Sequence, residues 1–584
     1  MSAAPALRIS VGQHSDKGRK PVNQDFHGVA APPAALLHSK GIAIALADGI
    51  GSSAVSQVAS EFAVMGLLDD YYCTSEAWSV KKSVERVLAA TNSWLHSRTQ
   101  EGQFRHDMDR GYVCTLSALV LKAATAHVFH VGDTRVYRVH AETLEPLTQD
   151  HRVQLAGGQS CLSRAVGFNT QLEIDYQALP VERGDVFLLA SDGVHEHVDE
   201  AFMAAAVRQQ RGDLDHAARS ICDEALRRGS PDNLTVQIVA IDELPSLPVQ
   251  GQPPLPQELP QLPPPPILEA RMVLDGWRIV RELHGSSRSH VYLAVDIETD
   301  ALAVLKTPSI DLQHDAAYLE RFAMEEWIAR RIHSAHVLEP CAPTRKREYL
   351  YLATEYIDGK TLTQWMIDNP RPTLEVVRGI VEQIARGLQA FHRLEMLHQD
   401  LRPANIMIDS TGTVKIIDFG ATRVAGIEEM AWPLERDGAI LGTAQYTAPE
   451  YFLGEPGSAR SDLFSLAVIT YQMLSGRLPY GTQVATVRTR EAQRRLEYQS
   501  VLDDQREIPV WIDEVLRKAL HPQPLRRYDT LSEFIHDLRQ PNQAFLSRAR
   551  PPLIERHPVL FWKAVATLLA LAVLALLMAR YGVR

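Results

Sequence analysis

The amino-acid sequence predicts a multidomain α+β protein with two folded domains, a spacer between them and one membrane-spanning helix near the C-terminal end. Three observations support this prediction. The chain has 584 residues, more than one ordinary domain needs. Ten prolines lie between Pro245 and Pro266, and a long apolar run lies near the C-terminal end. The expected divisions are residues 1–243, 244–271, 272–540, 541–558 and 559–579.

Composition and charge narrow the classes of function. The net charge is -11, so no basic surplus is available to neutralise phosphates, and no nucleic-acid partner is expected. The five cysteines are widely scattered and form no CxxC pair. This usage argues against a zinc site or a disulfide framework and suits a reducing cytoplasm. No apolar run stands at the N-terminus, so no signal peptide is expected.

The proline-rich stretch at 244–271 is predicted to be a linker. Proline has no backbone N–H and a fixed φ, so such a stretch cannot continue a helix or a central strand. We expect extended polyproline at about 3.1 Å per residue, which acts as a semi-rigid spacer. A ligand for an SH3-like domain is the alternative interpretation.

The run at 559–579 is apolar except for Lys563 and Thr567. As a helix with a rise of 1.5 Å per residue it would be about 31 Å long, enough to cross a bilayer core. A buried amphipathic helix is the alternative, but the run has no polar face. Basic residues are more frequent before the run than after it. We therefore expect a single-pass C-terminal anchor with both folded domains in the cytoplasm.

Acidic residues stand at the ends of short apolar runs in the first domain. The runs at 42–47, 127–131, 186–190 and 234–241 have the length of buried strands. Carboxylates at such strand ends can converge at one rim of a sheet, where they repel one another unless hard cations lie between them. A two-metal site of this kind can bind a phosphate and activate water. The candidate carboxylates are Asp25, Asp48, Asp133, Asp192 and Asp232.

Over residues 8–242 the motifs VNQDF, ADGIG, VGDTR, ASDG and SPDNLT resemble the PPM family of metal-dependent Ser/Thr protein phosphatases. The resemblance implies an α-β-β-α sandwich with two or three Mn²⁺ or Mg²⁺ ions. It implies the following metal-site roles: Asp48 bridges two metals, Asp192 and Asp232 complete one site, Gly49 lends its carbonyl to the other, Asp25 holds metal-bound water and Asp133 helps to bind a third ion.

The phosphate-binding position of this family departs from its usual residue. The family places an arginine three residues before Asn23, where this chain has Lys20, with Arg19 next to it. Lysine offers a point charge in place of a bidentate fork, so weaker phosphate capture is expected.

The second domain contains a set of residues suited to phosphoryl transfer. Lys306 lies in AVLK, Glu325 lies on a predicted helix at 316–332, and the motifs HQDLRPAN, DFG and APE follow. In this chemistry a lysine neutralises nucleotide phosphates and is held by a glutamate, an aspartate accepts the hydroxyl proton, and an asparagine and a second aspartate hold Mg²⁺. Glu326 is the alternative partner of Lys306, because spacing alone does not fix the helical phase.

Order and spacing over about 277–538 resemble the eukaryotic-like protein kinases, which have a bilobal fold. The resemblance implies ATP and Mg²⁺ as cofactors. It assigns these roles: Asp400, Lys306, Asn405 and Arg402 are catalytic; Asn405 and Asp418 hold metal; Glu325 supports the nucleotide site; Glu355 and Ile357 present backbone groups to adenine beside the gatekeeper Thr354. Glu450 is expected to pair with Arg527 as part of the scaffold.

Two departures bear on activity. The glycine-rich loop before Val291 has lost its three glycines, which normally let the backbone approach phosphates. Gln399 replaces the arginine that couples a phosphorylated activation loop to the site. The sequence therefore leaves two hypotheses. The first is a bacterial inner-membrane protein that is both phosphatase and kinase, acting on phosphoproteins and with itself as a candidate substrate. The second is an active phosphatase regulated by a pseudokinase scaffold.

Overall fold

The computed structural model describes residues 6–50, 53–140, 143–154, 160–245, 262–342, 345–430, 444–502, 507–542 and 558–581. Most of the predicted linker and of the segment at 541–558 lies outside these residues, so the predicted polyproline conformation stays a prediction.

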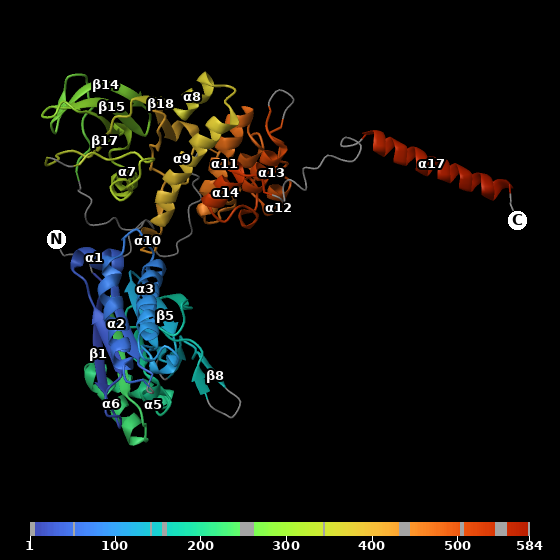
Figure 1. The fold of residues 1–584 in the computed structure, drawn as a ribbon. Coiled ribbons are helices and arrows are strands. Elements are labelled where there is room, and N and C mark those ends of the chain that lie inside the picture. Colours follow the sequence, from blue (N-terminus) through green and yellow to red (C-terminus); the bar gives the residue numbers. More distant parts are fainter. Residues whose placement is uncertain are drawn as a thin grey trace.

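The N-terminal domain contains two five-stranded antiparallel sheets, which form its two inner layers. The first sheet has the order β1 (Arg8–Asp16), β12 (Leu234–Glu243), β11 (Val186–Ala190), β6 (Arg135–Val139) and β7 (Leu144–Pro146). The second has the order β10 (Asp175–Pro180), β5 (Thr125–Val131), β4 (Leu116–Lys122), β3 (Ile42–Asp48) and β2 (Asp25–Ala30). A small hairpin of β8 (Arg152–Gln154) and β9 (Ser160–Leu162) projects from this domain (Figure 1).

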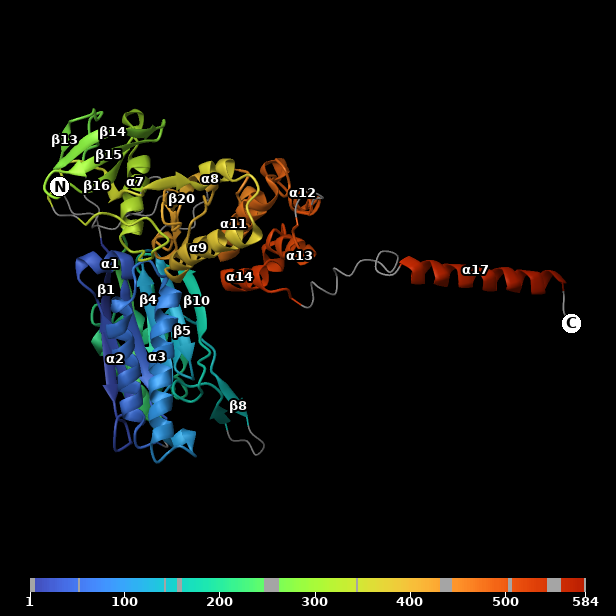
Figure 2. The same cartoon turned by 45° about the horizontal axis from the view of Figure 1, so that its top comes forward.

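Helices cover the outer faces of these sheets, which gives four layers (Figures 1 and 2). The helices are α1 (Ala34–Lys40), α2 (Ser56–Cys73), α3 (Val80–Glu101), η1 (Met108–Arg110), α4 (Asp192–His195), α5 (Glu200–Gln209) and α6 (Leu214–Arg227). α2 packs on the second sheet, and α6 packs on the first. This arrangement confirms the predicted α-β-β-α sandwich.

The side chains of β3 show why its residues form a strand buried on both faces. Ala43 and Ala45 belong to the core under α2 and α3, whereas Ile42, Ile44 and Leu46 belong to the core between the two sheets. Alternate residues of a strand point to opposite faces, so small residues face the helices and branched residues fill the space between the sheets. The strand ends at Asp48, at the rim of the sandwich.

The C-terminal domain begins with a small lobe built on one antiparallel sheet. The order is β13 (Val273–Leu274), β14 (Trp277–Gly285), β15 (Ser289–Asp296), β16 (Leu302–Pro308) and β17 (Leu352–Glu355). The turn η2 (Ile310–Leu312) and the helix α7 (Ala316–Ala329) belong to the same lobe.

The large lobe is mostly helical, so the predicted bilobal fold is confirmed (Figure 1). Its helices are α8 (Leu362–Asp368), α9 (Leu374–Arg393), α10 (Ala425–Glu428), α11 (Ala459–Ser475), α12 (Arg490–Arg494), α13 (Val510–Ala519) and α14 (Leu531–Arg539). Short strands and turns complete it: β18 (Gly359–Thr361), β19 (Met396–Leu397), β20 (Ile406–Asp409), β21 (Val414–Ile416), β22 (Arg423–Val424), η3 (Pro403–Asn405), η4 (Pro449–Leu453), η5 (Gln483–Thr486) and η6 (Pro524–Arg526).

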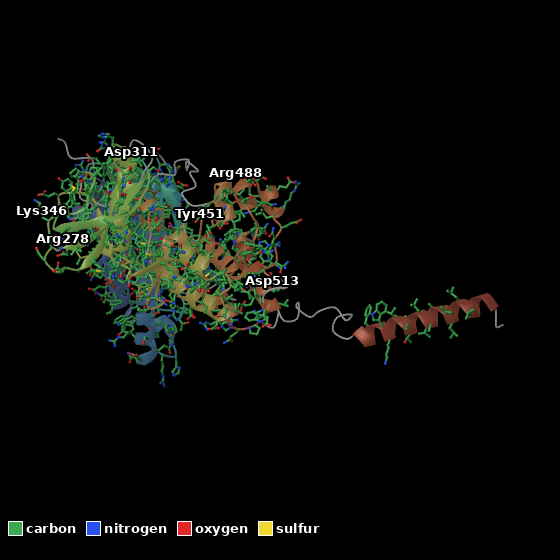
Figure 3. All side chains as sticks on the ribbon, turned by 90° about the horizontal axis from the view of Figure 1, so that it is seen from above. Arg278, Asp311, Lys346, Tyr451, Arg488 and Asp513 are labelled. Carbon is green, nitrogen blue, oxygen red and sulfur yellow. The ribbon has the colours of Figure 1, made fainter. Side chains whose placement is uncertain are left out.

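The helix α17 (Pro558–Tyr581) occupies the residues for which the sequence predicts a membrane span. Its described leucine side chains, such as Leu568, are exposed, and Figure 3 shows side chains projecting from this helix. Within the described part of the chain, however, no helix combines the length and apolar character that crossing a membrane requires. The predicted span, on which the membrane partner and the inner-membrane location rested, is therefore not supported.

Candidate active sites

The first candidate site lies where the strands of the two sheets end at one rim of the N-terminal domain. Antiparallel pairing of β2 with β3 places Asp25 opposite Asp48. Asp133 follows β5, and Asp192 is the first residue of α4 after β11. Carboxylate oxygens of Asp48, Asp133 and Asp192 lie within 4.8 Å of one another. The structure thus brings together residues that are far apart in the sequence.

Burial and mutual repulsion destabilise the ionised form of these carboxylates when no cation lies between them. Burial, opposed in part by a hydrogen bond from Thr235, raises the pKa of Asp25 to about 6. Burial and the charge of Asp133 raise the pKa of Asp192 to about 6, and burial together with Asp25 raises that of Asp48. Among the described residues, Oδ1 of Asp25 and Oδ1 of Asp192 have no hydrogen-bond partner. Buried carboxylate oxygens without a hydrogen-bond partner, at or beside a cluster of converging carboxylates, fit hard divalent cations.

Gly49 follows Asp48 at the same rim. Its N–H donates to the carbonyl of Gln24 at 3.1 Å. An added Cβ would come within 2.8 Å of Ser56, the first residue of α2. A glycine is therefore needed for the close approach of α2 to the carboxylate cluster.

Lys20 and Arg19 behave differently, although they are neighbours. Lys20 forms an ion pair with Asp232, a predicted metal ligand that lies outside the tight three-residue cluster. Arg19 donates instead to the carbonyl of Gly229 at 3.4 Å. Asn233 donates to the carbonyls of Lys17 at 2.9 Å and Val22 at 3.0 Å, which ties the loop of Lys20 to the loop of Asp232. Lys20 is thus placed at the site, and Arg19 is not.

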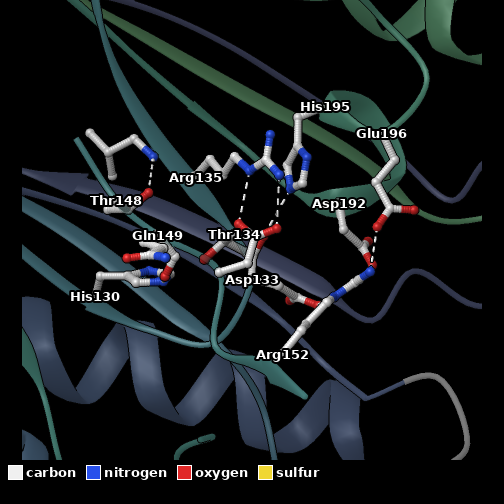
Figure 4. A network of polar contacts seen from close by, with 12 residues as sticks. His130, Asp133, Thr134, Arg135, Thr148, Gln149, Arg152, Asp192, His195 and Glu196 are labelled. Atoms are coloured by element: carbon white, nitrogen blue, oxygen red, sulfur yellow. Dashed lines mark hydrogen bonds and ion pairs between the residues drawn. The ribbon is translucent and has the colours of Figure 1, made fainter. Parts of the chain in front are cut away.

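Sequence reasoning missed Arg152, which reaches between the carboxylates (Figure 4). Its guanidinium donates to Oδ2 of Asp133 at 2.7 Å and to Oδ2 of Asp192 at 2.9 Å, and it pairs with Glu196. Arg152 begins β8 and belongs to none of the recognised motifs. Only the three-dimensional contact reveals it.

The second candidate site lies between the lobes of the C-terminal domain. Nζ of Lys306, on β16, lies 2.6 Å from Oε2 of Glu325 on α7 and 3.3 Å from Oδ1 of Asp418. Glu326, the alternative partner, forms ion pairs with Arg330 and with Arg347 at 2.8 Å. The helical phase of α7 therefore assigns Glu325 to Lys306.

Burial governs the electrostatics of this ion pair. Burial raises the pKa of Glu325 to about 7, although the ammonium of Lys306 opposes the shift. Burial also acts to raise the pKa of Asp418, but Lys306 outweighs it and the pKa lies below its ordinary value. Lys306 is thus held between two carboxyl groups, one on α7 and one that follows β21.

The catalytic-loop residues form a connected group. Nδ2 of Asn405 donates to the carbonyl of Asp400 at 2.9 Å and to its Oδ2 at 3.1 Å. Nε of Arg402 lies 3.3 Å from Oδ1 of Asn405 and 3.6 Å from Oδ2 of Asp400. The side chains of Asp400, Asn405 and Arg402 are therefore close to one another, as the predicted shared role requires.

The buried Asp462 holds this loop and was not identified from the sequence as a site residue. Its two carboxylate oxygens accept from the backbone N–H groups of His398 and Gln399, each at 3.0 Å. Gln399 has a φ of 65°, an uncommon conformation for a residue other than glycine. A buried carboxylate that receives both amides can stabilise this strained turn. Asp462 lies in the SDLF motif near the start of α11, which is the signal that could have identified it.

The adenine-facing and glycine-loop positions are also described. Thr354 is buried on β17; the side chain of Glu355 pairs with Lys415 at 2.6 Å, and Ile357 is buried. At the turn between β14 and β15, Oγ of Ser286 accepts from the N–H of Ser289 at 3.1 Å, and the N–H of Ser286 donates to the carbonyl of Ser289 at 3.0 Å. Serine side-chain bonds therefore close a turn that glycines usually form.

Glu450 and Arg527 form the predicted pair inside the large lobe. The guanidinium of Arg527 donates to both carboxylate oxygens of Glu450, at 2.8 and 2.7 Å, and both side chains are almost fully buried. The prediction of this pair is confirmed.

These folds and sites define a chain with a domain of the metal-dependent phosphatase class followed by a domain of the protein-kinase class. Residues 13–228 match the family described as protein phosphatase 2C, and residues 279–538 match the protein kinase domain family. The chain therefore joins a protein phosphatase 2C domain to a Ser/Thr protein kinase domain.

Individual relatives match one domain or the other. A serine/threonine-protein kinase, PknA of Corynebacterium glutamicum, is 34% identical over 206 residues, 34% of this chain and 42% of the relative. PppA, a key regulatory component of T6SS in Pseudomonas aeruginosa, is 25% identical with a TM-score of 0.35 and covers 41% of this chain and 99% of its own. The Mycobacterium tuberculosis PknI kinase domain is 26% identical with a TM-score of 0.36, covering 47% and 98%. The chain spans less than half the length of the curated kinases it matches.

Proposed function

We propose that the chain is a bifunctional enzyme of bacterial signalling that removes phosphate from, and transfers phosphate from ATP to, Ser/Thr residues of proteins. Phosphoprotein substrates follow from both activities, and the chain itself is a candidate substrate of each. The proposed functional units are residues 1–243 for the phosphatase and 272–540 for the kinase, separated by the linker at 244–271.

The convergence of Asp48, Asp133 and Asp192 within 4.8 Å is the observation that supports the phosphatase half. These residues, with Asp25, Asp232 and the carbonyl of Gly49, would hold two or three Mn²⁺ or Mg²⁺ ions. Such ions, when bound, stabilise phosphate charge and lower the pKa of water at the site. Lys20 would hold phosphate oxygens as a point charge.

The assembled triad of Lys306, Glu325 and Asp418 supports the kinase half. Lys306 would bind nucleotide phosphates, and Asp418 with Asn405 would hold Mg²⁺. Asp400 would accept the proton of the substrate hydroxyl, with the positive charge of Arg402 beside it. The backbone of Glu355 and Ile357 would contact adenine.

The loss of the loop glycines favours a second candidate, an active phosphatase regulated by a pseudokinase scaffold. Thermal stabilisation by MgATP tests nucleotide binding in both cases. Transfer of the γ-phosphate to protein occurs only if the kinase is active. Binding without transfer under any condition would therefore favour the scaffold.

Removal of divalent metal tests the phosphatase assignment. We expect chelation to abolish hydrolysis of a phosphoserine or phosphothreonine peptide and Mn²⁺ or Mg²⁺ to restore it. Asp192→Asn should lower the rate by about 100-fold or more, because the site loses a ligand. The exposed Asp223→Asn on α6 is the matched control and should retain full activity. Full hydrolysis in chelator would contradict the assignment.

A further inference from the structure

The two domains are joined by a specific contact surface that no family motif predicts. The loop at 74–79, between α2 and α3 of the phosphatase domain, packs on the kinase domain beside α10 (Figure 1). Ala77 is fully buried and belongs to the core of the kinase large lobe. The indole N–H of Trp78 and Nζ of Lys82 each lie 2.9 Å from the carbonyl of Arg393. Deep burial with directional bonds marks this surface as a built interface.

The contacts converge on two kinase segments that flank the catalytic site. Oε2 of Glu395, just before β19 and the catalytic loop, accepts from the N–H and the hydroxyl of Ser79, each at 2.8 Å. The N–H of Gly426, in the activation segment just after β22, donates to the carbonyl of Ala77 at 3.0 Å. A Cβ on Gly426 would lie only 2.4 Å from the carbonyl oxygen of Glu76, so the contact requires glycine there.

A buried lysine adds a further contact between the phosphatase domain and the activation segment. The side chain of Lys122, at the end of β4, is fully buried and donates to the carbonyl of Gly426 at 2.6 Å. The same ammonium lies 3.1 Å from Oε2 of Glu429, which also accepts from the N–H of Val80 at 2.9 Å. Burial lowers the pKa of Lys122, and Glu429 opposes that shift. A buried charge is tolerated only with such a partner, so the pair ties the two domains together.

This contact coexists with an assembled kinase site. Directly before the segment that contains Gly426, β22 pairs with β19. Phe419 is buried, with its ring 5.7 Å from that of Phe391. Lys306, Glu325 and Asp418 are in contact at the same time. In kinases with an arginine before the catalytic aspartate, a phosphate on the activation loop can order this segment. Gln399 has no charge with which to make that link.

We propose that the phosphatase domain anchors the kinase activation segment. Its 74–79 loop and Lys122 hold Gly426 and Glu429 in position, and this contact replaces the usual link between a phosphorylated activation loop and an arginine. The inference rests on the proposed kinase activity. It means that the phosphatase domain supports the kinase by binding it, at a surface separate from the phosphatase site. The helix α2 begins at the carboxylate rim and ends at the contact loop, about 27 Å away at 1.5 Å per residue.

The test compares full-length variants in an Asp192→Asn background, which silences dephosphorylation. Lys122→Met with Glu429→Gln removes the buried pair, and Gly426→Val forces the surfaces apart by bulk. Lys81→Met, at an exposed lysine of α3 next to the contact loop, is the matched control. Phosphoryl transfer from labelled ATP to casein gives kcat and KM. Hydrogen exchange of residues 423–430 reports the anchor directly.

We expect both anchor variants to lose at least tenfold in kcat and to lose exchange protection at 423–430, with the control unchanged. With Asp192 restored, their phosphopeptide hydrolysis should stay within about twofold of wild type. Unchanged or increased transfer in the variants would overturn the anchor, and so would retained protection. If the parent protein transfers no phosphate, the kinase proposal fails by itself. MgATP affinity then decides the anchor: weaker binding in both variants supports it, and equal binding overturns it.

Discussion

At the residue scale, both sites depend on carboxylates that burial makes costly and that a cation stabilises. Most of these residues could be identified from the sequence, because each sits in a short motif whose order is informative. Arg152 could not be assigned in that way, and Asp462 was not recognised as a site residue although it lies in the SDLF motif. The first acts through contacts with strand ends far away in the sequence, and the second supports the backbone of another segment. Such roles depend on distances that spacing along the chain does not determine.

The pH dependence of the kinase should report on Glu325. Burial raises the pKa of this carboxyl to about 7, and only its ionised form pairs with Lys306 as an ion. We therefore expect the transfer rate to be about half-maximal near pH 7, to reach its plateau well above it, and to fall by about tenfold per pH unit well below it. Glu325→Gln should be slower and should lack this limb of the profile. An identical pH profile in the variant would show that another group titrates.

At the element scale, the strands were predicted well, because a buried strand is a short apolar run. The predicted runs at 42–47, 127–131, 186–190 and 234–241 all lie within strands of the structure. The helix predicted at 316–332 ends at residue 329 in the structure. Helical periodicity also left Glu325 and Glu326 as alternatives, since adjacent residues differ by only about 100° around a helix. Tertiary contacts with β16 settle the choice.

The turn between β14 and β15 should depend on the Ser286 hydroxyl. Ser286→Ala removes the side-chain bond to the N–H of Ser289. We expect a looser nucleotide lid, seen as a roughly two- to fivefold higher KM for ATP with kcat nearly unchanged, since one hydrogen bond contributes about 1 kcal/mol. The exposed Ser287→Ala is the matched control. Equal KM values for both variants would mean that the hydroxyl does not shape the lid.

The scaffold of the large lobe should depend on Arg527. Arg527→Met leaves Glu450 as a buried, unpaired charge, so the free energy of unfolding of the kinase domain should fall by about 3–5 kcal/mol. Chemical denaturation of the full chain, with hydrogen exchange in α11 as the readout, measures this loss. The neighbouring exposed Arg526→Met should be nearly neutral. If both variants are equally stable, the buried pair is not a structural support.

At the scale of the whole molecule, the sequence predicted two domains in the right order but not how they meet. Both domains carry motif sets, whereas the 74–79 loop and Lys122 look like ordinary surface loop and strand-end residues in the sequence. The membrane span predicted from the sequence is not supported by the structure. The apolar run does form a helix, Pro558–Tyr581, but no helix among the described residues has both the length and the apolar character needed to cross a membrane.

The central claim is that one chain both adds and removes phosphate, and incubation with γ-labelled ATP and Mg²⁺ tests it most directly. The measurement follows label on the protein and on added casein in the wild type, in Asp192→Asn and in Asp192→Asn with Asp400→Asn. We expect label to accumulate in Asp192→Asn, to be released as phosphate by the wild type, and to be absent from the double variant. No incorporation by Asp192→Asn, despite bound MgATP, would contradict the claim.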